Sequence, residues 1–237
     1  MKVLFAGPSL HGQEYVRAEL ELRAPARQGD VYTAVREGAV AIGLVDGVFG
    51  AVPSVWHKEI LFALSEGVRV IGGGSLGALR AAECHAFGME AIGTIAADYL
   101  SGARTEDSDV CLAHCPAELG FMPLSEPLVD VETTLLALEA NGVISAAEDT
   151  ALLAAASALY FGARTVEALT GATALPPDRC AAIERAYRAG RISVKATDAL
   201  AVIDRLRALP DERGSRPGWR FVESDPWRHF LTQQAGA

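Results

Sequence analysis

Ser75 is the residue whose neighbours best suit it to act as a nucleophile. It lies in the pattern Gly73-x-Ser75-x-Gly77, between a short apolar run at 68–71 and a helical pattern over 76–87. A serine at a sharp strand-to-helix turn holds its hydroxyl clear of the backbone, and the N–H of the next residue, Leu76, would help to form an oxyanion hole. The helix N-terminus also favours developing negative charge. This pattern therefore predicts acyl transfer at Ser75.

The same turn allows two further interpretations. Gly72-x-Gly74-x-x-Gly77 also fits the dinucleotide-binding fingerprint. That fingerprint normally follows the first strand of its unit, with an acidic residue about 20 positions later, at the end of the next strand. Here the turn follows an internal strand, and Glu90 precedes the next apolar run. Serine is also a preferred helix N-cap, so Ser75 as a simple cap is the third interpretation.

His57 is the expected general base for Ser75. It lies near the start of the preceding helical pattern, predicted over 54–65, and shares one face with three apolar residues, Ile60, Leu61 and Leu64. This spacing predicts that the imidazole points inward. Asp46 or Glu59 would then orient it as the third member of a triad. A lone inward histidine is more often a core residue than a catalyst, and an aspartate before glycine is common in turns.

Three loops are expected to bring the other candidate residues together. Apolar runs at 2–6, 39–45 and 68–71 each end in a polar or glycine-rich loop. In open parallel sheets ligands bind at the carboxyl ends of the strands, where such loops meet. The candidate substrate-binding or oxyanion residues are Gly7, Ser9, Gly47, Gly74, Leu76, Gly77 and Arg80. Arg80 is three positions from Glu83, so these two side chains also form a simple surface pair in the alternative interpretation.

The alternation of strands and helices predicts an α/β fold. We expect a mostly parallel sheet flanked by helices, a Rossmann-like three-layer arrangement, over residues 1–126. A further strand is predicted at 110–113. Residues 127–209 are rich in alanine and leucine with helical spacing, which predicts an α-helical C-terminal lobe or a helical cover on the sheet. Residues 210–237 are expected to form a loosely packed tail, docked by Trp219, Trp227 and Phe230.

Composition excludes several classes of function. The chain has 237 residues, half of them hydrophobic, and a net charge of −9 without a long basic run. A nucleic-acid partner is therefore not expected, since binding to the phosphate backbone depends on basic side chains. No apolar stretch reaches eighteen residues, so no membrane span is expected. The acidic cluster Glu106-Asp107-Ser108-Asp109 lacks the ligand spacing of a metal site, and neither a metal nor a cofactor is expected.

The cysteines and the N-terminal segment both predict a cytoplasmic location. Four cysteines are few for this length, and none forms a CxxC pair. Such a pattern is typical of free thiols in a reducing compartment. The apolar run after Met1 is too short for a signal peptide.

Several motifs in order resemble the TfuA-like family. They are Ile42-Gly43-Leu44-Val45-Asp46-Gly47, Val55-Trp56-His57-Lys58-Glu59-Ile60-Leu61 and Gly74-Ser75-Leu76-Gly77-Ala78-Leu79-Arg80-Ala81-Ala82-Glu83. The segments Gly7-Pro8-Ser9-Leu10, Gly29-Asp30-Val31, Phe87-Gly88-Met89 and Glu106-Asp107-Ser108-Asp109-Val110 agree with it. The resemblance covers roughly residues 3–135.

This resemblance implies a supporting role in backbone thioamidation of a ribosomal peptide or protein. Members of the family accompany YcaO proteins, which activate a backbone amide with ATP so that sulfide can replace its oxygen. The family's proposed activity is hydrolysis of a thiocarboxylated C-terminus on a ubiquitin-like sulfur-carrier protein, which releases hydrosulfide. The implied partners are a YcaO-type cyclodehydratase, that carrier and the precursor peptide or protein target. Thiocarboxylate hydrolysis is acyl transfer, so it agrees with the prediction for Ser75.

The chemistry and the class of function each leave alternatives open. In one version Ser75 attacks the thiocarboxylate carbon and His57 takes its proton; in the other His57 activates water and Ser75 only positions the substrate. A non-catalytic adaptor that brings the peptide or the sulfur source to the YcaO enzyme is the alternative function. A nucleotide-binding enzyme that uses the glycines as an anion cradle is a third.

Overall fold

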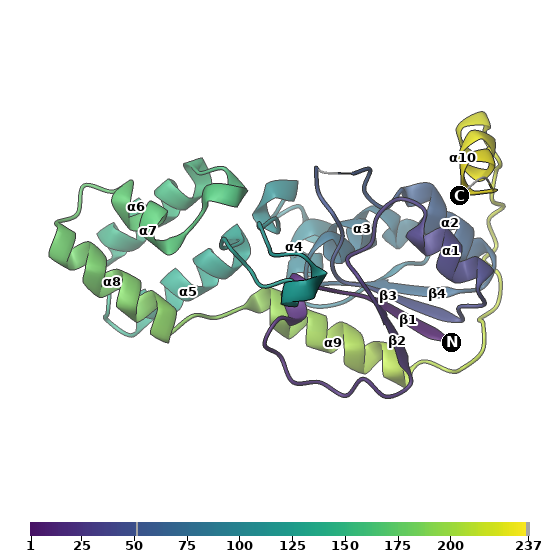
Figure 1. The fold of residues 1–237 in the computed structure, drawn as a ribbon, viewed down its shortest axis with the longest axis horizontal. Helices are drawn as coiled ribbons and strands as arrows, with labels where there is room; N and C mark the ends of the chain where they lie inside the picture. Colours follow the sequence, from purple (N-terminus) through teal and green to yellow (C-terminus); the bar gives the residue numbers. More distant parts are fainter. Residues whose placement is uncertain (51, 236–237) are drawn as a thin grey trace.

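A five-stranded sheet forms the centre of the molecule (Figure 1). The computed structural model describes residues 1–50 and 52–235. The strand order is β2-β1-β3-β4-β5, and all neighbouring pairs are parallel. The strands are β1 Lys2–Phe5, β2 Leu20–Arg23, β3 Ala41–Leu44, β4 Arg69–Gly72 and β5 Glu90–Ala91. The predicted α/β fold with a parallel sheet is confirmed.

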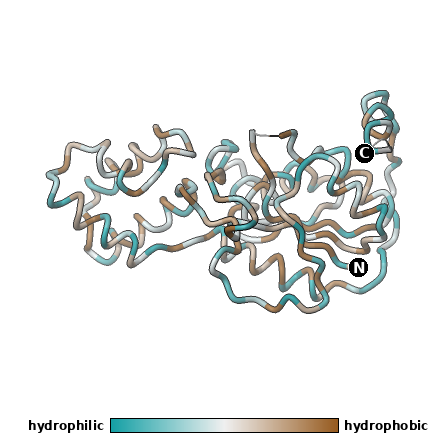
Figure 2. The backbone as a smooth tube through the Cα atoms, viewed as in Figure 1, coloured by the Kyte–Doolittle hydropathy of each residue, from teal (hydrophilic) through white to brown (hydrophobic). Residues whose placement is uncertain are grey.

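Helices cover both faces of this sheet. Val3 and Phe5 pack into one core with α1 (Asp30–Arg36), α2 (His57–Ser65) and α3 (Leu76–Cys84). Leu4 and Ala6 face the opposite side, where α9 (Val194–Ala208) lies. Successive side chains of a strand point to opposite faces, and a sheet covered on both sides needs apolar residues at both sets of positions. This requirement explains the continuous apolar runs in the sequence, which Figure 2 shows in brown at the centre.

Four helices form a second group beside the sheet: α5 (Leu128–Ala140), α6 (Ala146–Ala158), α7 (Val166–Gly171) and α8 (Pro177–Ala189). Helix α4 (Thr94–Ser101) packs instead against α3 and α9. Short 3-10 turns lie at Pro8–Leu10, His85–Phe87, Asp107–Asp109, Ala117–Leu119 and Phe161–Ala163. Helices α5 to α8 share a core of their own, formed by residues that include Leu135, Leu152 and Ile183. Residues 127–209 thus supply both a helical lobe and, through α9, a cover for the sheet. The boundary at residue 126 stays a prediction.

The predicted strand at 110–113 is wrong. Val110 follows a 3-10 turn and is buried with Ala78, Ile95 and Val129, between helices α3, α4 and α5. Its apolar character therefore comes from packing between helices and not from a sheet position. The sequence also did not predict α4, the two-residue β5, or β2, which lies at one edge of the sheet and reads Leu-Glu-Leu-Arg.

The tail ends in a helix that the sequence did not predict, α10 (Asp225–Ala235). Trp227 and Phe230 on this helix are buried, and the Trp227 ring lies 5.3 Å from that of Phe62 on α2. Further ring contacts join the two residues to Tyr32 and Trp56. Aromatic docking therefore holds α10 against α1 and α2.

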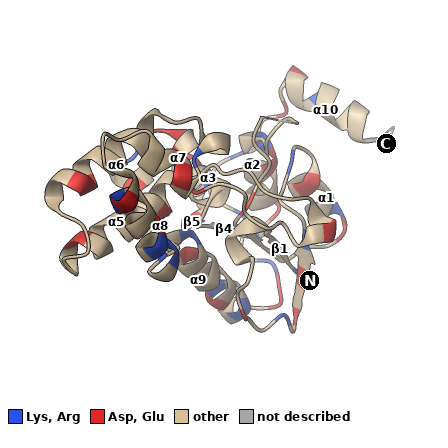
Figure 3. Ribbon diagram, turned by 60° about the vertical axis from the view of Figure 1, so that its left-hand side comes forward, with Lys and Arg blue, Asp and Glu red and all other residues tan. Residues whose placement is uncertain are grey.

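In the described ranges, no helix combines the length and the apolar character needed to cross a membrane. Figure 3 shows acidic and basic side chains together on the same helices, α8 and α9 among them.

Candidate active site

The loops that follow β1, β3 and β4 meet at the carboxyl edge of the sheet. A Cβ added at Gly47 would lie 1.8 Å from Leu76 Cδ2, so the loop after β3 touches the first turn of α3. The Gly77 N–H donates to the Val45 carbonyl at 3.0 Å. A cavity of about 730 Å³ opens at this edge, and Pro8, Asp46, Gly47 and Ser75 all contribute to its wall.

The glycines of the turn allow β4, α3 and β3 to approach closely. A Cβ at Gly72 would lie 2.2 Å from the Gly77 carbonyl oxygen, and a Cβ at Gly77 only 1.8 Å from the Leu44 carbonyl oxygen. Gly74 has a φ of +76°, which L side chains rarely adopt. Packing and turn geometry are therefore enough to account for the spacing that fits a dinucleotide fingerprint.

Ser75 is the N-cap residue of α3, yet its hydroxyl does not cap the helix. The residue is 3% exposed, and its side chain makes no cap hydrogen bond. Within the described residues Ser75 Oγ has no hydrogen-bond partner at all, and the Leu76 N–H donates to no backbone or side-chain acceptor. At this helix N-terminus, the hydroxyl without a hydrogen-bond partner could act as a nucleophile, and the free amide N–H could donate to an oxyanion.

Asp46 holds the loop after β1 in place. Its Oδ2 accepts hydrogen bonds from the Gly7 N–H at 2.8 Å and the Ser9 N–H at 3.0 Å, while Oδ1 accepts from Ser9 Oγ at 2.7 Å. The carboxylate is 1% exposed. These three hydrogen bonds explain why a buried carboxylate is tolerated at position 46. Within the described residues, no hydrogen bond joins Asp46 to His57. Three sequence candidates, Gly7, Ser9 and Asp46, are thus parts of one structural unit.

His57 does not line the cavity that Ser75 borders. Its Nε2 lies 2.7 Å from Glu83 Oε2, and its side chain is 44% exposed, so the predicted inward orientation is wrong. Arg80 also donates to Glu83, at 2.7 Å, and to the Val55 carbonyl at 2.9 Å. Burial raises the pKa of Glu83, but hydrogen bonds from His57 and Arg80 outweigh it and hold that pKa below its usual value. The catalytic role of His57 and the binding role of Arg80 stay predictions.

Glu59 is fully buried between α1 and α2. Its carboxylate accepts hydrogen bonds from the backbone N–H groups of Gly29, Tyr32 and Trp56. Burial raises the pKa of Glu59 to about 7 in spite of these donors. Glu59 therefore ties the start of α1 to the start of α2, and its role in a triad also stays a prediction.

Lys195 is the main residue at the cavity that sequence reasoning missed. It lies in the first turn of α9, is 2% exposed and lines the large cavity together with Ser75 and Asp46. Its Nζ donates to the Val110 carbonyl at 2.6 Å, and burial lowers its pKa. The signal that could have found it is a lysine at an apolar position of the α9 pattern, in register with Ala199, Val202 and Leu206.

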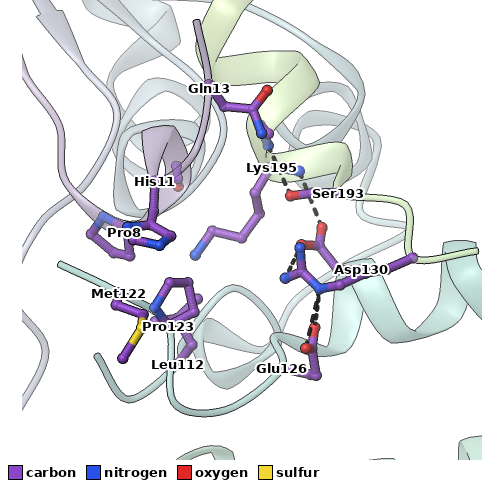
Figure 4. Close-up of a pocket in the computed structure, with 13 residues that line it drawn as sticks. Pro8, His11, Gln13, Leu112, Met122, Pro123, Glu126, Asp130, Ser193 and Lys195 are labelled. Atoms are coloured by element: carbon purple, nitrogen blue, oxygen red, sulfur yellow. Dashed lines mark hydrogen bonds and ion pairs between the residues drawn. The ribbon is translucent and has the colours of Figure 1, made fainter. Parts of the chain in front are cut away.

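A second cavity of about 250 Å³ lies on the other side of Lys195 (Figure 4). Arg191 pairs there with Glu126 at 2.9 Å and with Asp130 at 3.6 Å. Asp130 Oδ1 also accepts from the Lys195 N–H at 3.1 Å. Lys195, Pro8 and Leu112 belong to both cavities. Among the described residues, no group of three or more His, Cys, Asp or Glu side chains is arranged to hold a metal ion.

The fold and the site define a Rossmann-like α/β protein with a serine-bearing cavity at the carboxyl edge of its sheet. The family described as TfuA-like protein matches residues 46–165, about half of the chain, and the chain belongs to this family. Membership associates the protein with thioamidation. The matched segment includes Asp46, Ser75 and most of the large cavity's wall, while Lys195 lies beyond it. A comparison with curated proteins found no match.

Proposed function

We propose that this protein hydrolyses the thiocarboxylated C-terminus of a ubiquitin-like sulfur carrier and so releases hydrosulfide to a YcaO-type partner. The observation that supports this most is Ser75 itself: the residue is 3% exposed, its hydroxyl has no hydrogen-bond partner among the described residues, and it borders a cavity of about 730 Å³. Family membership supplies the context of thioamidation. Acyl transfer needs a nucleophile and donors for the oxyanion, and Ser75 with the Leu76 N–H would provide both.

The dimensions and the wall of the cavity suit the end of a protein tail. Its wall includes the glycine-containing loop 46–50 on one side and Tyr160 with Phe161 on the other. A carrier that ends in small residues would extend into this space with its reactive carbon toward Ser75. The aromatic side chains would then lie beside the backbone of the tail.

The direct experiment uses a ubiquitin-like protein prepared with a C-terminal thiocarboxylate. We expect the purified protein to release hydrosulfide from this carrier and to form a transient carrier–enzyme ester at Ser75, seen as a covalent adduct by denaturing electrophoresis and intact mass. Ser145→Ala is a matched control, because Ser145 is also a helix N-cap but lies on α6 and caps its helix through a hydrogen bond to Glu148 N. This variant should keep both release and adduct.

A non-catalytic adaptor is the second candidate, and one observation favours it. Large apolar residues are exposed on the segment that leads to the cavity, including Leu119 at 60%, Leu124 at 54% and, across the cavity, Tyr160 at 68%. Such exposed apolar side chains often mark protein-binding surfaces. The tail aromatics do not contribute, since Trp227 and Phe230 are buried within the molecule. Binding of the carrier without any hydrosulfide release would establish the adaptor and overturn the hydrolase.

A further inference from the structure

Lys195 occupies the wall between the two cavities. Its helix, α9, is capped by Ser193, whose Oγ accepts from the Ala196 N–H at 3.1 Å, so the backbone of Lys195 is fixed. Figure 4 shows its amine end projecting into the smaller cavity, toward Pro8, Leu112 and Pro123. The side chain is 2% exposed but borders both open spaces, so its amine is buried and still reachable by a ligand.

The serine turn packs directly against this part of α9. A Cβ added at Gly74 would lie 3.1 Å from the Lys195 carbonyl oxygen and 3.4 Å from the Ala199 N. Ser75, the next residue, borders the large cavity together with Lys195. Ser75, at the start of α3, and Lys195, at the start of α9, therefore line one cavity.

The partners of Lys195 leave its charge poorly compensated. Its Nζ donates to one neutral carbonyl, that of Val110, and within the described residues no carboxylate lies within 4.0 Å of it. Burial of an ammonium favours the neutral amine, and it lowers the pKa of Lys195. The titratable and charged groups around its side chain are His11, Asp46, Asp107, Cys111, His114, Glu126, Asp130 and Arg191.

Lys2 shows what a buried lysine with a structural role looks like in the same protein. It is 4% exposed, donates to the Arg207 carbonyl at 2.9 Å and pairs with Asp211 at 3.0 Å. It begins β1 and lies at the opposite end of the strands from the cavity. Lys2 therefore has an ion-pair partner, whereas Lys195 has none within the described ranges.

We propose that Lys195 is the base and proton carrier for Ser75, in the role that the sequence suggested for His57. This inference rests on the proposed function, since it concerns the same acyl transfer. Serine–lysine pairs are a known variant of the serine–histidine arrangement. Because burial lowers the pKa of Lys195, its amine loses its proton at a lower pH than an exposed lysine does, and a neutral amine can accept the hydroxyl proton directly or through one water.

The proton balance of the reaction is complete with these two side chains. Lys195 Nζ takes the Ser75 proton as Oγ bonds to the thiocarboxylate carbon. The C–S bond then breaks with its electron pair on sulfur, and the Lys195 ammonium returns the proton to sulfur, so hydrosulfide leaves. In the second half Lys195 takes a proton from water, hydroxide attacks the ester carbon, and the ammonium protonates Ser75 Oγ as it departs. The carboxylic acid product ionises and releases one proton to solvent.

The test compares Lys195→Met with Lys2→Met, on the thiocarboxylated ubiquitin-like protein. Lys195→Met should lower the kcat/KM of hydrosulfide release by about 10²- to 10⁴-fold, the usual contribution of a positioned acid–base group. Lys2→Met removes an equally buried lysine and should keep release near the wild-type rate even if its melting temperature falls. Near-wild-type release by a folded Lys195→Met protein would overturn the inference and leave the proposed function intact.

Lys195→Arg separates proton transfer from simple charge, and it retains a donor for the Val110 carbonyl. A guanidinium stays protonated, so we expect this variant to fold, to bind the carrier and to release hydrosulfide about 10²-fold more slowly than wild type or worse. In the wild type, kcat/KM should rise with pH to a plateau below the ordinary range of lysine, and that rise should be lost in Lys195→Arg. Full activity of Lys195→Arg would show that only a cation is needed and would overturn the inference. Absence of release by the wild type would instead refute the proposed function itself.

Discussion

Two regions of this protein carry side chains of the kinds that perform acyl transfer. They differ in whether those side chains are hydrogen-bonded to other groups of the protein. On the outer face of α2 and α3, His57, Glu83 and Arg80 are hydrogen-bonded to one another, and His57 and Glu83 are well exposed. At the cavity, Ser75 is 3% exposed and its Oγ has no hydrogen-bond partner among the described residues. Three other side-chain atoms of the described residues are buried without a partner, and none of their residues lines this cavity, so the missing partner of Ser75 matters because the residue borders an open space. The comparison teaches that a polar side chain without an internal partner that also borders a cavity marks the candidate site, and that a suitable residue type alone does not.

The largest expected effect comes from Ser75→Ala at the cavity. We expect hydrosulfide release from the thiocarboxylated carrier to fall by about 10³-fold or more, equivalent to about 4 kcal/mol of activation free energy. The fold should persist, because the Ser75 hydroxyl makes no hydrogen bond to the described residues. The measurement is kcat/KM together with thermal unfolding. A folded Ser75→Ala protein with wild-type turnover would remove the serine from the mechanism.

The next effect concerns Glu59 and depends on pH. Its pKa is raised from 4.5 to about 7, so between these values the folded state holds a proton that the unfolded state has released. The free energy of unfolding should therefore fall as pH rises through this window, by on the order of 3 kcal/mol from this group. Glu59→Gln does not titrate and should lose this component of the pH dependence.

Urea unfolding of wild type and Glu59→Gln at pH 5 and pH 8 measures the difference directly. If the two proteins show parallel pH profiles, the buried carboxyl is already ionised at pH 5. That result would contradict burial as the dominant influence on Glu59 and would reopen its candidacy as a carboxylate in the site.

A smaller effect is expected for Asp46→Asn. This variant tests whether Asp46 supports the wall of the cavity by holding the loop after β1. The amide keeps one acceptor oxygen, so at least one hydrogen bond from Gly7 N, Ser9 N or Ser9 Oγ is lost. We expect the free energy of unfolding to fall by about 2 kcal/mol, since hydrogen bonds to charged groups contribute about 1.5–3 kcal/mol each. Activity should fall through weaker substrate binding, as a higher KM. A change confined to kcat would indicate instead that Asp46 acts on the reacting atoms.

The smallest effect is expected for His57→Gln on the outer face. Exposed ion pairs contribute under about 1 kcal/mol, so both the free energy of unfolding and hydrosulfide release should stay close to wild type. The same assays as for Ser75→Ala give the answer. If His57→Gln lowered hydrosulfide release as much as Ser75→Ala does, the two regions would not differ as described, and His57 would again be the candidate base.

The elements that the sequence predicted well are those whose apolar patterns match a buried position. The runs at 2–6, 39–45 and 68–71 form β1, β3 and β4, and the helical patterns over 30–37, 54–65 and 76–87 contain α1, α2 and α3. The elements that were missed lack such a pattern. Strand β2 alternates apolar and charged residues at a partly exposed edge, and α10 depends on aromatic contacts with Tyr32 and Phe62, which are far away in sequence.

The sequence by itself determined the parallel sheet, the loops at its carboxyl edge and the place of Ser75 at the start of α3. These features follow from local patterns, because strand periodicity, glycine spacing and helix boundaries are properties of neighbouring residues. Only the tertiary structure decided which side chains share the cavity. On α2 the His57 side chain lies at the surface and Glu59 in the interior, while α9 brings Lys195 to the serine turn from 120 positions further along the chain. Such contacts depend on the packing of whole helices, which no local pattern specifies.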